Sequence, residues 1–574
     1  PNLPMWMVFD ASTNNGINNV PLVQYRGQGS GYPTAALNGV LVLGHRTSGD
    51  NWGNPIVNFI SEYIVRADPQ GGEGGVFNGG VAQRNDNVGF HSPGKLRINN
   101  SQIYDVAMTV RQSSPVDPNT GLPTPTIALA HRSGIAVITD VNNETVFDIN
   151  TDGTVGPGVD YIDFYNGDSI VCGWDTVGSG TRNTYTYKIP TTDSSASTSN
   201  IVIGRYVDTT TGGGSLIYYA QDASRITKVL GLKNNRFILV PSSYNPALTL
   251  IDENDADTNA PNGMSAFIHA DFNTGWMQGR CKLATLSSTS TTNLTNGQTA
   301  TDRSPNNLHL TVTGTITKTP VATGAELVAY SGFSAVNTGS YLTRAHNGNF
   351  DFGTGDFHVI FWMKGIQRYE TIYSYGNNSS TSGNLIIQTG SSNDGDTDRV
   401  YINGNAIGST SSGYKNTAWG MKAIVRRSGT VYFYMNGEQY HSAGNGASIG
   451  NSNNTLRIGE AGNACTAQGF GEDALDQGSI ALLRAGLSAP SEAQLKKMYH
   501  DEKFLFQENA KATVSGGSVG NDLVRALAYD EVQDTYHVAT PDGRSDFRGL
   551  RRINNTTTAV TTAISAHDGF IVEQ

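Results

Sequence analysis

Charged residues are scarce in this sequence, and negative charge is in excess. Asp, Glu, Lys and Arg make up 15% of the 574 residues, and the formal net charge at pH 7 is −11. Nucleic-acid binding needs clustered Lys and Arg side chains, and we find no basic run. The sequence therefore predicts no nucleic-acid partner, and it disfavours binding to anionic membranes for the same reason.

Long apolar runs and cysteine pairs are missing as well. No segment approaches the roughly 18 uninterrupted apolar residues of a membrane-spanning helix. The three cysteines, Cys172, Cys281 and Cys465, are far apart and odd in number, which does not indicate a disulfide framework. The N-terminal stretch PNLPMWMVFDAST lacks the basic and apolar regions of a secretory signal. We therefore expect no membrane insertion and a chain that folds in the cytosol.

Turn-forming residues are abundant, and they punctuate short apolar runs. Gly alone occurs 67 times, and Asn-Gly or Asn-Asn pairs separate candidate strands at Asn38-Gly39, Asn166-Gly167, Asn234-Asn235 and Asn436-Gly437. Asn and Gly tolerate the positive φ angles of two-residue hairpin turns. This pattern predicts an all-β protein built from hairpins.

The stretch RSGTVYFYMNGEQYH at 427–441 shows how one strand uses its two faces. Turns at Ser428-Gly429 and Asn436-Gly437 bracket a strand, so residues 421 to about 444 are predicted to form a three-stranded meander. Strand alternation then places Tyr432 and Tyr434 together on one face and the apolar side chains on the other. These two tyrosines are candidate platforms for sugar rings, although aromatic residues also serve simply as strand formers.

Two similar segments lie near opposite ends of the chain. TIALAHRSG at 126–134 and TYHVATPDG at 535–543 share the pattern T-x-x-[LV]-A-x-x-x-G. With the hairpins before residue 270, this similarity predicts a ring of small sheets, a β-propeller, whose last part comes from the C-terminus. An irregular array of β-sandwiches is the alternative.

A Ser/Thr/Asn-rich tract separates this region from a second one. The tract at 283–307 has little to bury and is predicted to be a linker or loop. After it come alternating strand patterns and one short helix that begins at Ser488 or Ser491, with capping-box spacing to Gln494. Leu495, Met498 and Tyr499 are its predicted apolar face.

The second region resembles a known fold family. FDFGTGDFHVIFWMKG, AWGMKAIVRRSGTVYFYMNGEQY, NTLRIGE and GSIALLRAGLSAPSEAQLKKMYHDE occur in the order of the signature pieces of laminin-G/concanavalin A-like jelly rolls. The flanking segments resemble tail-associated virion proteins of tailed bacteriophages that carry such a domain. The resemblance implies a lectin-like sandwich inserted into a larger virion protein.

The expected fold is therefore all-β, with a propeller-like β body and an inserted concanavalin A-like (laminin-G type) β-sandwich. The predicted domains are 1–280 for the first part of the propeller-like body, 281–304 for a linker, 305–506 for the jelly roll, and 507–574 for the C-terminal return to the propeller-like body.

Catalytic motifs are missing where relatives of such folds carry them. Retaining glycanases of the jelly-roll type use two carboxylates about 5 Å apart, typically on an E-x-D-x-E strand, and no such spacing occurs. We therefore predict no catalytic residues and a protein that is not an enzyme.

Calcium is the one cofactor for which the sequence offers ligands. Asp148, Asn150 and Asp152 fit the start of a D-x-[DN]-x-[DN]-G loop, and Asp394, Asp396 and Asp398 place three carboxylates on alternate residues. Solvated acidic turns are the alternative for both clusters.

These observations predict a structural virion protein of a tailed bacteriophage, in the tail, a fibre or a head appendage. Its expected partners are other virion proteins, further copies of itself and a host-surface glycan. A phage polysaccharide depolymerase and a bacterial surface adhesin are the alternatives.

Overall fold

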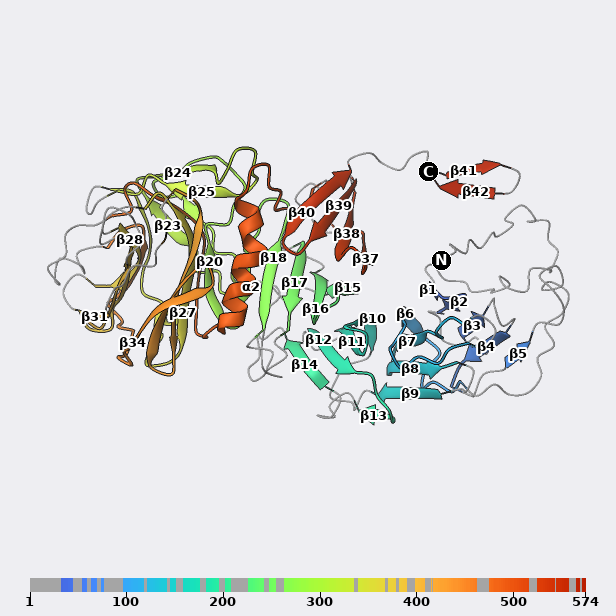
Figure 1. Cartoon of the computed structure of the whole chain (residues 1–574). Helices are drawn as coiled ribbons and strands as arrows, with labels where there is room; N and C mark the ends of the chain where they lie inside the picture. Colours follow the sequence, from blue (N-terminus) through green and yellow to red (C-terminus); the bar gives the residue numbers. More distant parts are fainter. Residues whose placement is uncertain are drawn as a thin grey trace. The chain divides into compact units, whose positions relative to one another are not determined.

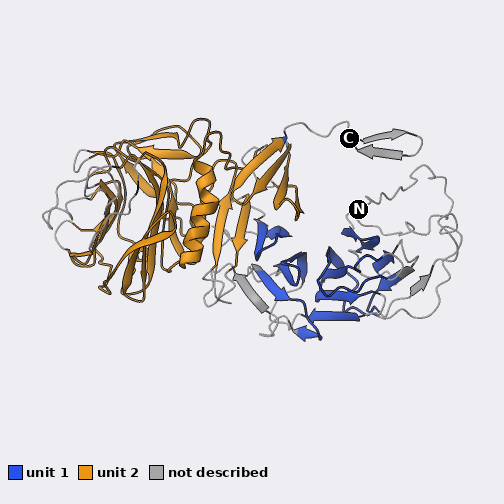
Figure 2. Ribbon diagram, in the orientation of Figure 1, with its two compact units in different colours: residues 1–205, 225–239, 556–574 blue, residues 206–224, 240–555 orange. Residues whose placement is uncertain are grey.

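The computed structural model describes residues 33–44, 54–58, 63–69, 74–76, 96–117, 121–141, 145–150, 158–175, 182–195, 202–207, 226–241, 247–253, 263–334, 339–366, 370–377, 381–389, 398–407, 414, 417–461, 474–515, 524–541, 543–556, 564–567 and 570–573. This part of the chain is all-β, as predicted, and consists mainly of antiparallel sheets (Figure 1). Two compact units divide the chain (Figure 2). Unit 1 comprises residues 1–205, 225–239 and 556–574, and unit 2 comprises residues 206–224 and 240–555.

Unit 1 contains small sheets whose strands mostly follow one another along the chain. Their orders are β1-β2-β3-β4-β5, β13-β9-β8-β7-β6 and β10-β11-β12-β14. The strands are β1 (Thr34–Leu37), β2 (Val40–Leu43), β3 (Asn54–Asn58), β4 (Tyr63–Ala67), β5 (Gly74–Val76), β6 (Ile103–Thr109), β7 (Thr126–His131), β8 (Gly134–Asp140), β9 (Thr145–Asn150), β10 (Val159–Tyr165), β11 (Ser169–Asp175), β12 (Arg182–Lys188), β13 (Ser194–Ser195) and β14 (Val202–Val207). The unit also holds β15 (Ile226–Gly231), most of β16 (Arg236–Pro241), β41 (Ile564–His567) and β42 (Phe570–Glu573).

The second of these sheets is buried on both faces. On β7, Ile127 and Leu129 join an apolar cluster with residues of the first sheet. Ala128 and Ala130, which alternate with them, join another cluster with residues of the third sheet. Because successive side chains of a strand point to opposite faces, the three sheets are stacked face to face around β7 and its neighbours.

Two equivalent aspartates tie neighbouring sheets together. Asp105 of β6 accepts hydrogen bonds from the amide of the next residue and from the Ile162 amide of β10, each at 3.0 Å. Asp163 of β10 repeats the pattern, with its following residue and the Gly231 amide of β15 donating at 2.8 Å. Burial raises the pKa of Asp163 to about 7. The two amide donors lower this pKa, and the charge of Asp105 raises it further.

The predicted hairpin turns are present. Both central residues have positive φ at Asn38-Gly39 (47° and 77°), Asn166-Gly167 (56° and 76°), Asn234-Asn235 (58° and 55°) and Asn436-Gly437 (53° and 83°). Each pair separates two consecutive strands. The turn chemistry therefore identified these hairpins correctly.

The repeated pattern T-x-x-[LV]-A-x-x-x-G also corresponds to a repeated structure. In each copy the Thr begins the second strand of its sheet and the Gly begins the third. Gly134 and Gly543 have φ angles of 140° and 146°, which a side chain would strain. The same strand-turn-strand unit thus occurs in unit 1 and in unit 2.

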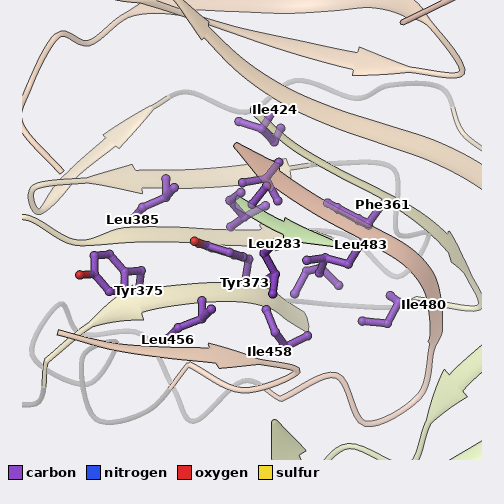
Figure 3. Packing of buried hydrophobic residues seen from close by; sticks show 14 of the residues in the cluster. Leu283, Phe361, Tyr373, Tyr375, Leu385, Ile424, Leu456, Ile458, Ile480 and Leu483 are labelled. Atoms are coloured by element: carbon purple, nitrogen blue, oxygen red, sulfur yellow. The ribbon is translucent and has the colours of Figure 1, made fainter. Parts of the chain in front are cut away.

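Unit 2 is dominated by two large sheets on one apolar core. The nine-stranded sheet has the order β21-β24-β25-β36-β27-β32-β33-β34, with β20 also paired to β36, and the eight-stranded sheet has the order β22-β23-β26-β35-β28-β29-β30-β31. Figure 3 shows side chains of both sheets in this core, with Leu283 of β20 among them. The strands are β20 (Cys281–Thr285), β21 (Leu294–Thr295), β22 (Thr299–Ala300), β23 (Leu310–Thr313), β24 (Thr315–Pro320), β25 (Val328–Ser331), β26 (Tyr341–Arg344), β27 (Phe357–Lys364), β28 (Glu370–Gly376), β29 (Leu385–Thr389), β30 (Asp398–Ile402), β31 (Asn405–Ile407), β32 (Gly420–Arg427), β33 (Thr430–Met435), β34 (Glu438–Gly444), β35 (Thr455–Ile458) and β36 (Ser479–Gly486), with a 3-10 turn, η3 (Gly348–Phe350).

The predicted linker at 281–304 is wrong. This segment supplies β20 and β21 to the nine-stranded sheet and β22 to the eight-stranded sheet. Fully buried Asp302 fixes it by accepting hydrogen bonds from the amides of Ala284 (2.8 Å), Ser304 (2.8 Å) and Leu308 (2.7 Å). The tract is ordered by backbone hydrogen bonds, which its polar composition did not reveal.

The helix α2 (Glu492–Glu502) begins as predicted. Ser491 is its N-cap, and the side chains of Ser491 and Gln494 form the reciprocal capping box. Near its end, buried Glu502 forms an ion pair with Arg484 of β36 and accepts a hydrogen bond from the Trp362 indole at 2.6 Å. A 3-10 turn, η4 (Lys503–Phe506), follows and stacks Phe506 on Trp362.

A smaller sheet near the C-terminus belongs to unit 2 rather than to unit 1. Its order is β37-β38-β39-β40, and unit 2 also holds three short strands that precede β20. The side chain of buried Asn273 donates to the carbonyls of Ala512 (2.8 Å) and Leu550 (3.0 Å). These hydrogen bonds join a residue that precedes the large sheets in the sequence to residues that follow them. The predicted domain boundaries at 280, 305 and 506 therefore do not match unit 2, whose main segment is residues 240–555. These strands are β17 (Leu248–Asp252), β18 (Met264–Ile268), β19 (Met277–Gln278), β37 (Ala526–Asp530), β38 (Thr535–Thr540), β39 (Gly543–Arg548) and β40 (Arg551–Thr556).

Candidate functional site

The two tyrosines predicted as sugar platforms lie on β33, on the face opposite the core. Val431, Phe433 and Met435 are in the core cluster, so the predicted alternation is correct. Tyr434 is only 1% exposed, however, which closes its ring to a ligand in this structure. Tyr432 is half-buried, and the Arg427 guanidinium lies 5.2 Å from its ring centre.

The first predicted calcium cluster lies at the end of β9. Asp148 is buried, and its Oδ1 is 3.9 Å from Nε2 of His131. Asn150 accepts a hydrogen bond from the side chain of Asn99, and Asp152 lies outside the described residues. The structure therefore places Asp148 and Asn150 on one strand, and Oδ1 of Asp148 is buried beside His131 without a hydrogen bond from a described residue.

The second predicted calcium cluster lies largely outside the described residues, which exclude Asp394 and Asp396. Asp398 begins β30, is buried, and contacts the ammonium group of Lys422. A described partner of the Asp398 carboxylate is therefore a cation of the protein itself. Within the described part of the chain, His, Cys, Asp and Glu side chains form no group of three suited to a metal.

Unit 1 contains a polar hollow of about 440 Å³ that the sequence did not predict. Three described segments line it: Pro69, two residues after β4, the stretch that leads into β6, and the turn between β7 and β8. The lining residues are Pro69, Asn99, Asn100, Ser101, Gln102, Arg132 and Ser133.

Hydrogen bonds among these segments fix the walls of the hollow. The Asn100 side chain donates to Oγ of Ser133 at 3.1 Å and accepts from the Gln102 amide at 2.9 Å. Below the surface, fully buried Asn54 donates to the carbonyl of Ser101 at 3.2 Å. The stretch that leads into β6 is therefore held to both β3 and the β7–β8 turn.

Arg132 gives the hollow its charge. The residue is exposed, and its guanidinium makes no hydrogen bond or ion pair with another described residue. Among the described residues that line the hollow, none is Asp or Glu. The arrangement offers amide, hydroxyl and guanidinium groups to a ligand, and these suit hydroxyl and carboxylate oxygens.

No family model and no curated protein matches the chain. Among solved structures, it is similar to the binding domain of botulinum neurotoxin DC in complex with rat synaptotagmin II, with 15% identity and a TM-score of 0.28 over 45% of this chain and 61% of that chain. The receptor binding domain of botulinum neurotoxin D is similar at 12% identity and a TM-score of 0.28, over 45% of this chain and 62% of the other. The matches thus span about three fifths of these neighbours. No helix in the described residues is long and apolar enough to cross a membrane.

Proposed function

We propose that this chain is a structural protein of a tailed-bacteriophage particle and that it binds glycan on the host surface. The finer architecture belongs to the same proposal. Unit 1, with its stacked antiparallel sheets, is part of a propeller-like body, and the two large sheets of unit 2 form a concanavalin A-like (laminin-G type) sandwich. The ordered signature pieces of the sequence and the strand-then-helix end of the sandwich support this assignment.

The observation that carries glycan binding is the polar hollow beside Arg132. Its amide and hydroxyl groups can exchange hydrogen bonds with sugar hydroxyls, and its guanidinium can pair with the carboxylate of an acidic sugar. The surrounding hydrogen bonds hold Asn100 and Ser133 in place before a ligand arrives, which lowers the entropic cost of binding.

The same lining favours binding over cleavage. Glycosidic bonds are hydrolysed by a pair of carboxyl groups that flank the bond, and none of the described residues on the walls of the hollow is Asp or Glu. A single hollow gives modest affinity, and many copies on one particle would raise it through effective concentration. Depolymerisation and attachment by a bacterial adhesin remain the alternatives that experiment distinguishes.

The binding site is tested with soluble oligosaccharides, one set neutral and one set containing uronic acids, by titration calorimetry on the full chain. Arg132→Ala should weaken binding of the acidic set by about 10- to 100-fold, because a hydrogen bond to a charged group contributes about 1.5–3 kcal/mol. Arg548→Ala, which removes an exposed arginine on β39, is the matched control. Equal affinities for the two variants would place the glycan site elsewhere.

A further inference from the structure

A buried ion pair connects the two large sheets of unit 2. Lys422 lies on β32 of the nine-stranded sheet and Asp398 on β30 of the eight-stranded sheet. Their side chains are 1% and 2% exposed, and Nζ of Lys422 contacts Oδ1 of Asp398. Two more polar groups belong to the cluster: Oγ1 of Thr389 lies 2.8 Å from Nζ, and the Tyr440 hydroxyl donates to Oδ2 of Asp398.

We propose that Lys422 and Asp398 form an intramolecular amide bond, Nζ to Cγ, with loss of one water. Burial makes both charged side chains costly, by several kcal/mol for each ion, whereas an amide carries no net charge. The two reacting groups are already in contact, and well-oriented intramolecular reactions reach effective molarities of about 10⁵–10⁸ M. The contact between the two sheets therefore supplies both the proximity and the driving force.

The reaction needs no other reactant. A proton passes from Nζ to the Asp398 carboxylate through their hydrogen bond, which leaves a neutral amine and a carboxylic acid. The amine lone pair attacks Cγ and the Nζ–Cγ bond forms. The protonated oxygen takes a second proton from nitrogen and leaves as water, so one ammonium and one carboxylate become one amide and one water.

Tyr440 assists this step from the edge strand β34. Its hydroxyl group donates to Oδ2, the oxygen that carries the negative charge when the amine adds to Cγ, because Oδ1 has taken the proton from Nζ. A donor aimed at that oxygen stabilises the tetrahedral intermediate. The resulting bond would join the two sheets covalently, so that a mechanical force on the protein could not separate β32 from β30.

The test is the mass of the full chain, measured after denaturation. The wild type should be lighter than its sequence by one water, and a protease digest should contain a branched peptide that joins Asp398 to Lys422. Lys422→Arg should restore the full sequence mass, because a guanidinium does not acylate under these conditions. Tyr440→Phe should lower the linked fraction of freshly purified protein.

Lys497→Arg is the matched control. Lys497 pairs with Asp501 at 2.9 Å, but the two side chains are 33% and 26% exposed, so water solvates this pair and lacks access to the buried one. This variant should still lack one water. A wild-type chain at its full sequence mass would overturn the proposal. So would a loss of water that persists in Lys422→Arg, because cyclisation at an Asp-Gly pair such as Asp394-Gly395 removes the same mass.

Discussion

Asp163 connects two neighbouring sheets of unit 1 with a carboxyl group whose pKa is raised to about 7. Burial is the main cause, and it favours the neutral form in the folded state. A carboxyl group with a raised pKa binds its proton more tightly in the folded chain than in the unfolded chain. Its contribution to stability is therefore fully present below the unfolded pKa of 3.8 and is lost as the pH rises through about 7.

Asp163→Asn should remove this pH dependence, because the amide stays neutral and keeps an oxygen acceptor. At pH 8 the variant should be more stable than the wild type, by up to about 4 kcal/mol for a shift from 3.8 to about 7, and at pH 5 the two should differ much less. The difference in melting temperature for the transition of unit 1 measures this. Asp168→Asn, at an exposed carboxylate, is the control. The same difference at both pH values would contradict the account.

Single residues also show where prediction from the sequence ends. Strand alternation placed Tyr432 and Tyr434 correctly on one face of β33, since that depends only on the backbone. It did not predict that Tyr434 would be 1% exposed, because burial depends on which other segments of the chain pack on that face. For the same reason, the spacing of Asp398 suggested calcium, whereas Lys422 from another sheet is its partner.

Among the elements of the fold, hairpins were predictable and the polar tract was not. An Asn-Gly pair between two apolar runs predicts a two-residue hairpin turn by itself, because few other residues accept positive φ at two consecutive positions. The tract at 281–304 has one such pair, Asn296-Gly297, but the strands on either side of it, β21 and β22, belong to different sheets and form no hairpin. Its strands are short, and they are fixed by pairing with β36, β24 and β23 and by the buried carboxylate of Asp302, all of which the fold brings from elsewhere.

Alanine substitutions in the two turns of the 420–444 meander measure two effects on stability. Both substitutions place a side chain at positive φ, but only one of them also brings that side chain against α2. Gly429 and Gly437 have φ angles of 78° and 83°, so an alanine at either site should cost about 1–2 kcal/mol. A Cβ at Gly437 would also lie 2.7 Å from Cα of Lys496 in α2, whereas at Gly429 the nearest atom is 3.9 Å away. Gly437→Ala should therefore destabilise unit 2 clearly more than Gly429→Ala in urea unfolding. Equal losses would show that α2 adjusts without cost.

At the scale of the whole molecule, the independently folding part begins earlier than residue 305. Trp276 donates from its backbone to Glu502 at 2.8 Å and from its indole to Asp501 at 2.9 Å, and β20 completes the nine-stranded sheet. A fragment of residues 305–506 should be insoluble or unfolded, and a fragment of residues 263–515 should show a cooperative melting transition by circular dichroism. A folded 305–506 fragment would mean that β20 and Trp276 are dispensable.

The polar hollow could not be predicted, because three segments far apart in the sequence assemble it. Pro69 follows β4, Asn100 precedes β6, and Arg132 lies between β7 and β8. None of these segments carries a motif, and only the stacking of sheets in unit 1 brings them together. The all-β class and the hairpins were accessible from local chemistry, whereas the site depends on tertiary structure.

Binding of glycan without cleavage is the central claim, and gel filtration of host capsule or lipopolysaccharide after incubation with the full chain tests it most directly. The protein should elute with the polymer, Arg132→Ala should do so less, and the chain length of the polymer should stay unchanged, because the described lining of the hollow holds no paired carboxylates. Progressive shortening of the polymer, abolished by changing a single Asp or Glu, would contradict the account and establish a depolymerase.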